Sequence, residues 1–265
     1  MIPRKNVVGT LALPLLLIGC SSSTSSNPSS TVGSTTAASV SSTATASTTT
    51  ASTATASTAT ASTVTGTTSS AEVTFTAQVW ADNWFSLYVN GVKVGEDSVP
   101  ITTVRSFNAE TFTFAASYPL TIAMVSKDYV ENESGLEYIG TDRQQMGDGG
   151  FIAQFTDTST GKVVATTSTA WKGLVIFRAP LNTDCVKSTD PLTACQHEIL
   201  SEPDGWTSPT FDDSAWVAAT EFTAAEVGPK EGYDTITWVP DAKLIWSSDL
   251  KVDNTILWRV TVPGT

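Results

Sequence analysis

Two groups of aromatic and polar residues have the composition of a ligand-binding site. The first group is a short stretch that contains Trp80, Asp82, Asn83 and Trp84. The second lies in the loop between Asp128 and Asp148 and includes Asn132, Glu137, Tyr138, Asp142 and Arg143. An aromatic ring can stack on the apolar face of a sugar while amides and carboxylates hydrogen-bond its hydroxyls. We therefore predict a sugar-type ligand site that comprises Trp80, Asp82, Asn83, Trp84, Tyr138, Asp142 and Arg143.

Two other interpretations of these residues stay open. The tryptophans could pack inside the domain while the polar residues are solvated. Asp82, Asp148 or the pair Asp253-Asn254 could instead bind a structural calcium ion, because Ca²⁺ prefers hard oxygen ligands. Their spacing does not specify a coordination geometry, so the metal ligands stay unassigned. We expect no other cofactor.

The adjacent carboxylates Asp212 and Asp213 invite an interpretation as catalytic acids. Neighbouring residues on a strand point to opposite faces, however, and on a turn such residues more often cap the segment that follows. The sequence contains no serine elbow, phosphate-binding loop or metal-spaced histidine cluster. The single histidine, His197, is expected in an exposed loop. We therefore predict that the protein is not an enzyme.

The N-terminal 20 residues are typical of a targeting segment. Two basic residues precede an apolar run that is too short for a transmembrane helix. The run ends at Leu17-Ile18-Gly19-Cys20, which resembles a bacterial lipobox. The resemblance implies that Cys20 is lipidated and that the lipoprotein is anchored at the outer membrane or cell surface through its lipid alone. An ordinary signal peptide, and hence a secreted protein, is the alternative.

The other two cysteines lie close together in the sequence. If Cys20 is lipidated, Cys185 and Cys195 remain as a pair. In an oxidising compartment they are expected to form a disulfide, which would stabilise the fold by about 2–3 kcal/mol on the chain-entropy estimate. A metal pair is the alternative, but the sequence offers no suitable further ligands.

Residues 21–70 are mostly Ser, Thr and Ala and include no charged or aromatic residue. Such a segment cannot bury a core, so we predict a disordered tether that reaches roughly 40 Å as a flexible coil. In a eukaryotic secreted protein this segment would instead be a mucin-like stalk. Cys20 would then be incidental, and Asn132-Glu133-Ser134 would be a candidate glycosylation site.

The chain is strongly acidic, with a formal net charge of −12, and all 26 acidic residues follow position 70. A domain with this charge repels phosphate, so we do not expect nucleic acid as a partner. Neutral sugars, cations or basic partners suit it better. A monomer is expected.

Residues 71–265 are predicted to form one all-β domain. In the stretch 85–89, apolar residues alternate with polar ones, and Asn90-Gly91 supplies the positive φ values of a type I′ hairpin turn. Further strands are predicted at 73–80, 92–94, 111–115, 120–125, 151–155, 163–167, 171–177 and 256–262, and residues 129–150 form a long polar loop. One helical turn is predicted between Ser214 and Phe222. Short strands with Gly- and Pro-rich turns indicate a sandwich or barrel.

Several motifs, taken in order, resemble the galactose-binding-like jelly roll. This module is found beside the catalytic barrels of β-galactosidases and α-rhamnosidases and in many carbohydrate-binding modules. The motifs cover most of residues 72–262 and comprise Asp82-Asn83, Tyr88 to Gly91, Tyr118 to Val125, Gly149 to Phe155, Ser168 to Lys172, Trp206 to Trp216, Ile245-Trp246 and Trp258-Arg259. The stretch from Trp206 to Trp216 is the closest match, whereas Ser168 to Lys172 lacks the family's aspartate.

The resemblance implies a jelly-roll β-sandwich in which Asp212-Asp213 is structural, and Trp206 and Trp216 are expected in the core. A glycosidase of this type would carry a following barrel of roughly 250 residues. The sequence ends at Thr265 without one, so we expect the accessory module alone. We therefore predict a surface-anchored lipoprotein that binds carbohydrate or another surface polymer without catalysis. The alternative is a structural or adhesive surface protein that binds protein partners through the sandwich.

Overall fold

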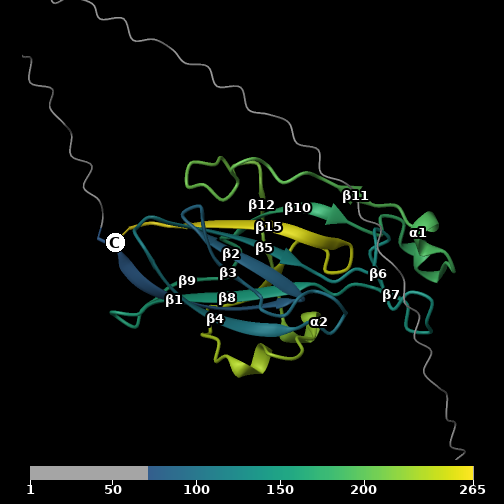
Figure 1. The fold of residues 1–265 in the computed structure, drawn as a ribbon, viewed down its shortest axis with the longest axis horizontal. Helices are drawn as coiled ribbons and strands as arrows, with labels where there is room; N and C mark the ends of the chain where they lie inside the picture. The colour runs from purple at the N-terminus through teal and green to yellow at the C-terminus, as the bar shows by residue number, and fades with distance from the viewer. Residues whose placement is uncertain (1–70, 265) are drawn as a thin grey trace, which may run out of the picture. The chain divides into compact units, whose positions relative to one another are not determined.

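The alternating apolar stretches of residues 71–264, which the computed structural model describes, form antiparallel strands in two packed sheets (Figure 1). The all-β sandwich class predicted from the sequence is confirmed. The predicted targeting segment, its Cys20 and the predicted tether lie outside the described residues. Among the described residues, no helix has the length and apolar character needed to span a membrane.

The first sheet, here called sheet A, has the strand order β13-β14-β8-β1-β4, and β9 also pairs with β8. All of its pairings are antiparallel. Its strands are β1 (Val73–Asp82), β4 (Asn108–Ala116), β8 (Gly150–Asp157), β9 (Val163–Thr166), β13 (Thr220–Phe222) and β14 (Leu244–Trp246).

The second sheet, sheet B, has the order β11-β10-β15-β5-β2-β3, and β12 also pairs with β10. Its strands are β2 (Trp84–Val89), β3 (Val92–Glu96), β5 (Leu120–Lys127), β10 (Lys172–Arg178), β11 (Glu198–Ile199), β12 (Val217–Ala218) and β15 (Asp253–Val262). Shorter elements are the pair β6 (Leu136–Glu137) and β7 (Gln145–Met146), the helices α1 (Pro191–Ala194) and α2 (Ala224–Val227), and the 3₁₀ turns Thr183–Lys187 and Tyr233–Thr235.

The predicted β2–β3 hairpin is confirmed, with its turn at Asn90 and Gly91. Both residues have positive φ values, 51° and 84°, as a type I′ turn requires. The Asn90 side chain also accepts a hydrogen bond from the Thr121 amide at 2.8 Å and donates one to the Ser117 carbonyl at 2.9 Å. The turn is therefore fixed against the start of β5.

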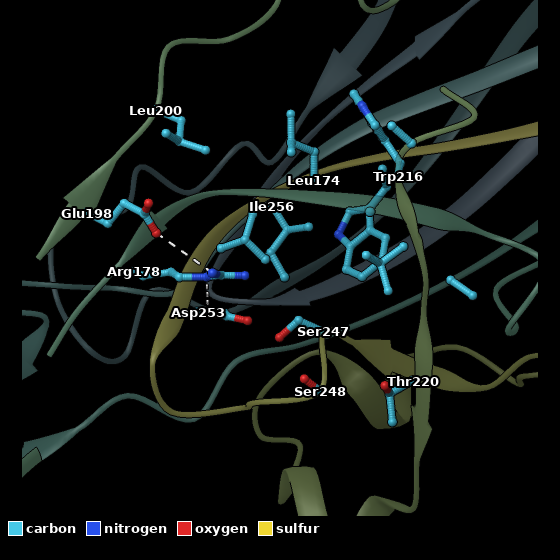
Figure 2. Close-up of a pocket in the computed structure, with 16 residues that line it drawn as sticks. Leu174, Arg178, Glu198, Leu200, Trp216, Thr220, Ser247, Ser248, Asp253 and Ile256 are labelled. Carbon is cyan, nitrogen blue, oxygen red and sulfur yellow. Dashed lines mark hydrogen bonds and ion pairs between the residues drawn. The ribbon is translucent and has the colours of Figure 1, made fainter. Parts of the chain in front are cut away.

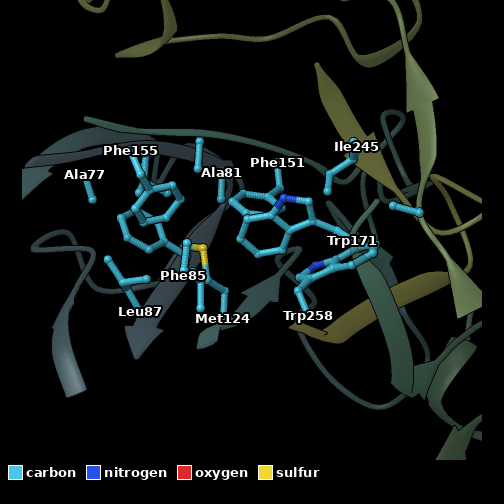
Figure 3. Packing of buried hydrophobic residues seen from close by; sticks show 14 of the residues in the cluster. Ala77, Ala81, Phe85, Leu87, Met124, Phe151, Phe155, Trp171, Ile245 and Trp258 are labelled. Atoms are coloured by element: carbon cyan, nitrogen blue, oxygen red, sulfur yellow. The ribbon is translucent and has the colours of Figure 1, made fainter. Parts of the chain in front are cut away.

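Aromatic and aliphatic side chains from both sheets fill the space between them (Figure 3). Phe151 lies edge-on to Trp171, with ring centroids 5.6 Å apart, and Trp258 lies 6.2 Å from Phe151. This cluster also contains Phe75, Ala77, Phe85, Leu87, Ile122, Met124, Phe155, Ile245 and Ile256. Burial of this apolar area is the main stabilising contribution to the sandwich.

Long segments cover part of the outer face of each sheet. Residues 223–243 pack over sheet A, where Trp80 and Ile152 contact Val227 and Ala242 in a second apolar cluster. Residues 200–216 pack over sheet B, where Trp206 joins Val125 and Leu257 in a third. Figure 1 shows these two segments on opposite sides of the sandwich. Because β5 is covered on both faces, all its residues except Lys127 are buried.

The disulfide predicted between Cys185 and Cys195 is confirmed, with the two Cα atoms 5.3 Å apart. Both cysteines are buried in a small cluster with Leu136 of β6. The disulfide loop therefore packs against the segment 129–150, which was predicted as a polar loop and contains the β6–β7 pair.

The predicted helical turn between Ser214 and Phe222 is wrong. This stretch forms two short strands, β12 and β13, because the edges of β10 and β14 offer unpaired backbone groups. The amide of Ala219 donates to the carbonyl of Trp171 at 2.8 Å, which holds the chain at the sheet edge. Tertiary pairing thus overrides the weak local helical pattern.

Candidate functional site

Three carboxylates converge where the ends of the two sheets meet. Asp82 ends β1, Asp128 directly follows β5, and Asp148 precedes β8. One carboxylate oxygen from each lies within 4.8 Å of the other two. The chain crosses from sheet A to sheet B at this point, since the Asn83 amide donates to the Lys127 carbonyl at 2.7 Å. Long-range strand pairing therefore builds this group, which we call the acidic centre.

Several buried polar atoms at the acidic centre have no hydrogen-bond partner among the described residues. They are both carboxylate oxygens of Asp128, Oδ1 of Asp82, and both polar atoms of the Asn254 side chain. Asn254 is fully buried, and its backbone carbonyl accepts a hydrogen bond from the backbone amide of Asp128 at 2.8 Å. Its side-chain amide lies near Asp128, although no hydrogen bond of ordinary geometry forms between them. Buried polar groups are normally paired, so these atoms need an explanation.

Lys230 supplies positive charge to the acidic centre. Its Nζ lies 2.8 Å from Asp148 Oδ2 and 3.4 Å from Asp82 Oδ2. The same ammonium lies 4.8 Å from the centroid of the Phe107 ring, a cation–π distance. One ammonium thus faces three carboxylates, and Asp128 receives no hydrogen bond from it.

Burial is the main cause of the raised pKa values at the acidic centre, and the neighbouring carboxylates add to it. Burial, with a further contribution from the Asp148 charge, raises the pKa of Asp82 well above its usual value. Burial also raises the pKa of Asp128, and the charge of Asp82 adds to it. The pKa of nearby Glu137 rises to about 7, mainly through burial. A site of this kind stabilises a proton or a further cation.

A second feature is a groove of about 310 Å³ at the β10 edge of sheet B. β11 and β12 pair with opposite ends of β10. The segment 200–216 between them does not pair with β10 and instead packs over the outer face of sheet B. The groove therefore opens beside Leu174 and Val175 in the middle of β10. Its lining residues include Leu174, Val175, Arg178, Glu198, Trp216, Thr220, Ser247, Ser248, Asp253, Ile256 and Trp258.

The groove combines an aromatic wall with an ion-paired polar wall (Figure 2). Arg178 Nε donates to Asp253 at 2.9 Å, and its Nη1 lies 3.7 Å from Glu198. On the other side is the half-buried Trp216, whose ring packs against Phe211 at 5.6 Å between centroids. Trp258, also a lining residue, has a buried indole N–H that finds no partner in the described part of the chain. This arrangement can accept a ligand with an apolar face and several hydroxyls.

The predicted ligand residues of the first stretch do not form one exposed platform. Trp80 is fully buried on sheet A, where its Nε1 donates to the Glu231 carbonyl at 3.0 Å. Asp82 and Asn83 are buried at the acidic centre. Trp84 is half-buried on sheet B, with Lys127 Nζ 5.2 Å from its ring centroid. A fully buried indole such as Trp80 cannot stack on a sugar in this structure.

The predicted loop residues belong to the β6–β7 segment, which packs against the disulfide loop. Tyr138 is half-buried beneath Arg143, whose guanidinium carbon is 4.1 Å from its ring centroid. Asp142 is exposed. Gln144 fixes this loop by donating to the carbonyls of Val186 and Ser188 at 2.7 and 2.8 Å. The ligand-binding role of Tyr138, Asp142 and Arg143 stays a prediction.

Asp212 and Asp213 have the structural roles expected of them. Asp212 is exposed and accepts the Ser214 amide at 2.9 Å. Asp213 accepts hydrogen bonds from Lys172 at 2.9 Å and from the buried Arg259 at 3.0 Å. Of the two tryptophans expected in the core, Trp206 is buried, whereas Trp216 is only half-buried.

The predicted exposure of His197 is confirmed, and its ring nitrogen lies 3.6 Å from Glu133.

The sequence analysis named Asp82 and Asp148 as possible oxygen ligands of a calcium ion, and both belong to the acidic centre. Asp128 and Lys230 were missed, because single charged residues give no spacing signal. Arg178 and Glu198 of the groove were missed for the same reason. In comparisons with known proteins, no family model, curated protein or solved structure matches this chain.

Proposed function

We propose that this sandwich binds a neutral, hydroxyl-rich ligand, a carbohydrate or related surface polymer, in the groove between β11 and β12. The observation that carries the proposal is the half-buried Trp216 opposite the ion-paired Arg178. The volume of about 310 Å³ is suited to a small ligand such as one or two sugar rings. Because Glu198 and Asp253 already neutralise Arg178, the groove favours a neutral ligand over an anion.

We further propose that the sandwich is a galactose-binding-like jelly roll, held at a membrane surface by a lipid on Cys20. The two antiparallel sheets and the order of the sequence motifs support this assignment. The protein then acts as a non-catalytic binding module. The groove contains the carboxylates of Glu198 and Asp253, but both are engaged by Arg178 and are not free to act as an acid–base pair.

The apolar rim of the groove favours a second candidate, a protein segment as the ligand. Val217 is 74% exposed, and Ile199 and Leu200 beside β10 are 56% and 44% exposed. A protein partner would bury these side chains, whereas a sugar would mainly contact Trp216 and the polar wall.

A glycan and polysaccharide panel probed with the full chain tests the carbohydrate assignment. We expect saturable binding, and we expect Trp216→Ala to weaken it at least about tenfold, because an aromatic platform dominates such contacts. Trp84→Ala is the matched control, since Trp84, which lies in β2, is also half-buried but does not line the groove. Circular dichroism establishes that both variants are folded.

Loss of binding in Trp84→Ala but not in Trp216→Ala would move the site away from the groove and back to the stretch first predicted. A panel without any binder would contradict the carbohydrate assignment and favour a protein partner at the apolar rim.

A further inference from the structure

We propose that Asp82, Asp128 and Asp148 form a binding site for a hard divalent cation, with Ca²⁺ as the best-suited ion, and that the Lys230 ammonium competes with this cation for the site. The proposal concerns the acidic centre alone and does not depend on what the groove binds.

The distances fit a metal ion. One oxygen from each carboxylate lies within 4.8 Å of the others. Calcium lies about 2.3–2.6 Å from its oxygen ligands, so two oxygens on opposite sides of the ion are about 4.6–5.2 Å apart. The three carboxylates can therefore contact one ion without a large rearrangement of the strands that carry them.

A second observation, independent of the carboxylates, also indicates a ligand. The Asn254 side chain is fully buried beside Asp128, and neither its oxygen nor its nitrogen has a hydrogen-bond partner among residues 71–264. An amide oxygen is an ordinary calcium ligand. Asp128 itself is 3% exposed, and both its oxygens lack hydrogen-bond partners in the same part of the chain. A cation among these groups would satisfy atoms that would otherwise be costly to bury.

The donor chemistry selects the class of ion. The cluster offers three carboxylates and includes no cysteine or histidine, and Asn254 beside it adds an amide oxygen. Oxygen donors suit Ca²⁺ and Mg²⁺ rather than zinc or copper. Mg²⁺ requires near-ideal octahedral geometry and keeps several waters, whereas Ca²⁺ tolerates an irregular set of protein oxygens. A fully buried Asp128 and Asn254 therefore favour Ca²⁺.

Lys230 is placed to exchange with the cation. It bonds Asp148 and Asp82 but leaves Asp128 unpaired, so it neutralises the acidic centre only in part. Its side chain is 33% exposed and lines a surface cavity of about 420 Å³, into which it can withdraw. A separate cavity of about 350 Å³ is lined by Gly147 and Asp148, so it reaches one member of the acidic centre.

Calorimetric titration of the full chain with CaCl₂ tests the proposal. We expect stoichiometric binding that Asp128→Asn weakens at least about tenfold, because a charged ligand is lost. Lys230→Met should bind Ca²⁺ at least about tenfold more tightly, because the competing charge is removed. Asp204→Asn, an exposed carboxylate outside the cluster, is the matched control and should leave the affinity unchanged.

If Lys230 has only a structural role, Lys230→Met will have a lower thermal stability and an unchanged calcium affinity. That result would overturn the proposal that Lys230 competes with the cation. Absence of binding at millimolar Ca²⁺ in both the wild type and Lys230→Met, with both chains folded by circular dichroism, would overturn the cation site itself. Equal weakening by Asp128→Asn and Asp204→Asn would show non-specific attraction to an acidic surface, which also contradicts the proposal.

Discussion

Asp97, at the end of the β2–β3 hairpin, shows how burial controls a single carboxyl group. The residue is 4% exposed, and its Oδ1 accepts a hydrogen bond from the Val99 amide at 2.8 Å, while Oδ2 has no partner within residues 71–264. Burial raises the pKa of Asp97 from 3.8 to about 6, and the nearby charge of Glu110 contributes in the same direction. The folded protein therefore favours the protonated form of this group.

The raised pKa of Asp97 predicts a loss of stability between pH 4 and pH 6. The folded state binds a proton in this range that the unfolded chain has already released, so the free energy of unfolding falls as pH rises. The contribution of this group is at most about 3 kcal/mol, from about 1.4 kcal/mol for each pKa unit. Asp97→Asn should reduce this pH dependence, measured by urea unfolding at pH 4 and pH 6.5. An unchanged difference between the two pH values would contradict it.

At the scale of elements, an ionic network fastens the segment 200–216 to sheet B. Arg259 of β15 is 2% exposed, and its guanidinium donates to Asp213 at 3.0 Å and to the carbonyl of Trp206. Lys172 of β10 donates to the same Asp213 carboxylate at 2.9 Å. Asp213 thus connects the covering segment to two strands, and it fixes the backbone next to Trp216.

Removal of this carboxylate should be strongly destabilising. Asp213→Ala leaves the buried Arg259 without its counter-charge, so we expect a loss of about 2–4 kcal/mol in the free energy of unfolding. Asp212→Ala is the matched control. The Asp212 carboxylate is adjacent in sequence, but it is exposed and accepts a hydrogen bond only from Ser214 among the described residues. This substitution should change stability little. Chemical denaturation compares the two variants, and equal losses would show that the network is not what fastens this segment.

Local and long-range features differed in how well the sequence predicted them. The hairpin turn at Asn90-Gly91 and the strands around it follow from neighbouring residues, so they were predicted. The crossing of the chain from β1 to β2 separates Trp80 and Trp84 onto different sheets, which the sequence does not show. The acidic centre and the groove depend on contacts between residues far apart in the chain, such as Asp82 with Lys230 and Arg178 with Asp253.

At the scale of the whole molecule, the proposed lipid anchor predicts where the protein is found. If Cys20 carries the lipid, Cys20→Ala should move the protein from the membrane fraction to the soluble fraction, because multiple acyl chains are needed for stable anchoring. Fractionation of cells that express each form measures this. Membrane association that survives Cys20→Ala would contradict lipid anchoring.

Locating the bound ligand by NMR is the most direct test of the proposed function. The indole N–H signals of the tryptophans can be followed by NMR while neutral mono- and disaccharides are added to the full chain. We predict that the signals of Trp216 and Trp258, which line the groove, shift in a saturable manner, whereas that of Trp80, buried on the other sheet, does not. Saturable shifts confined to Trp80 and Trp84, with Trp216 and Trp258 unchanged, would contradict a binding site in the groove.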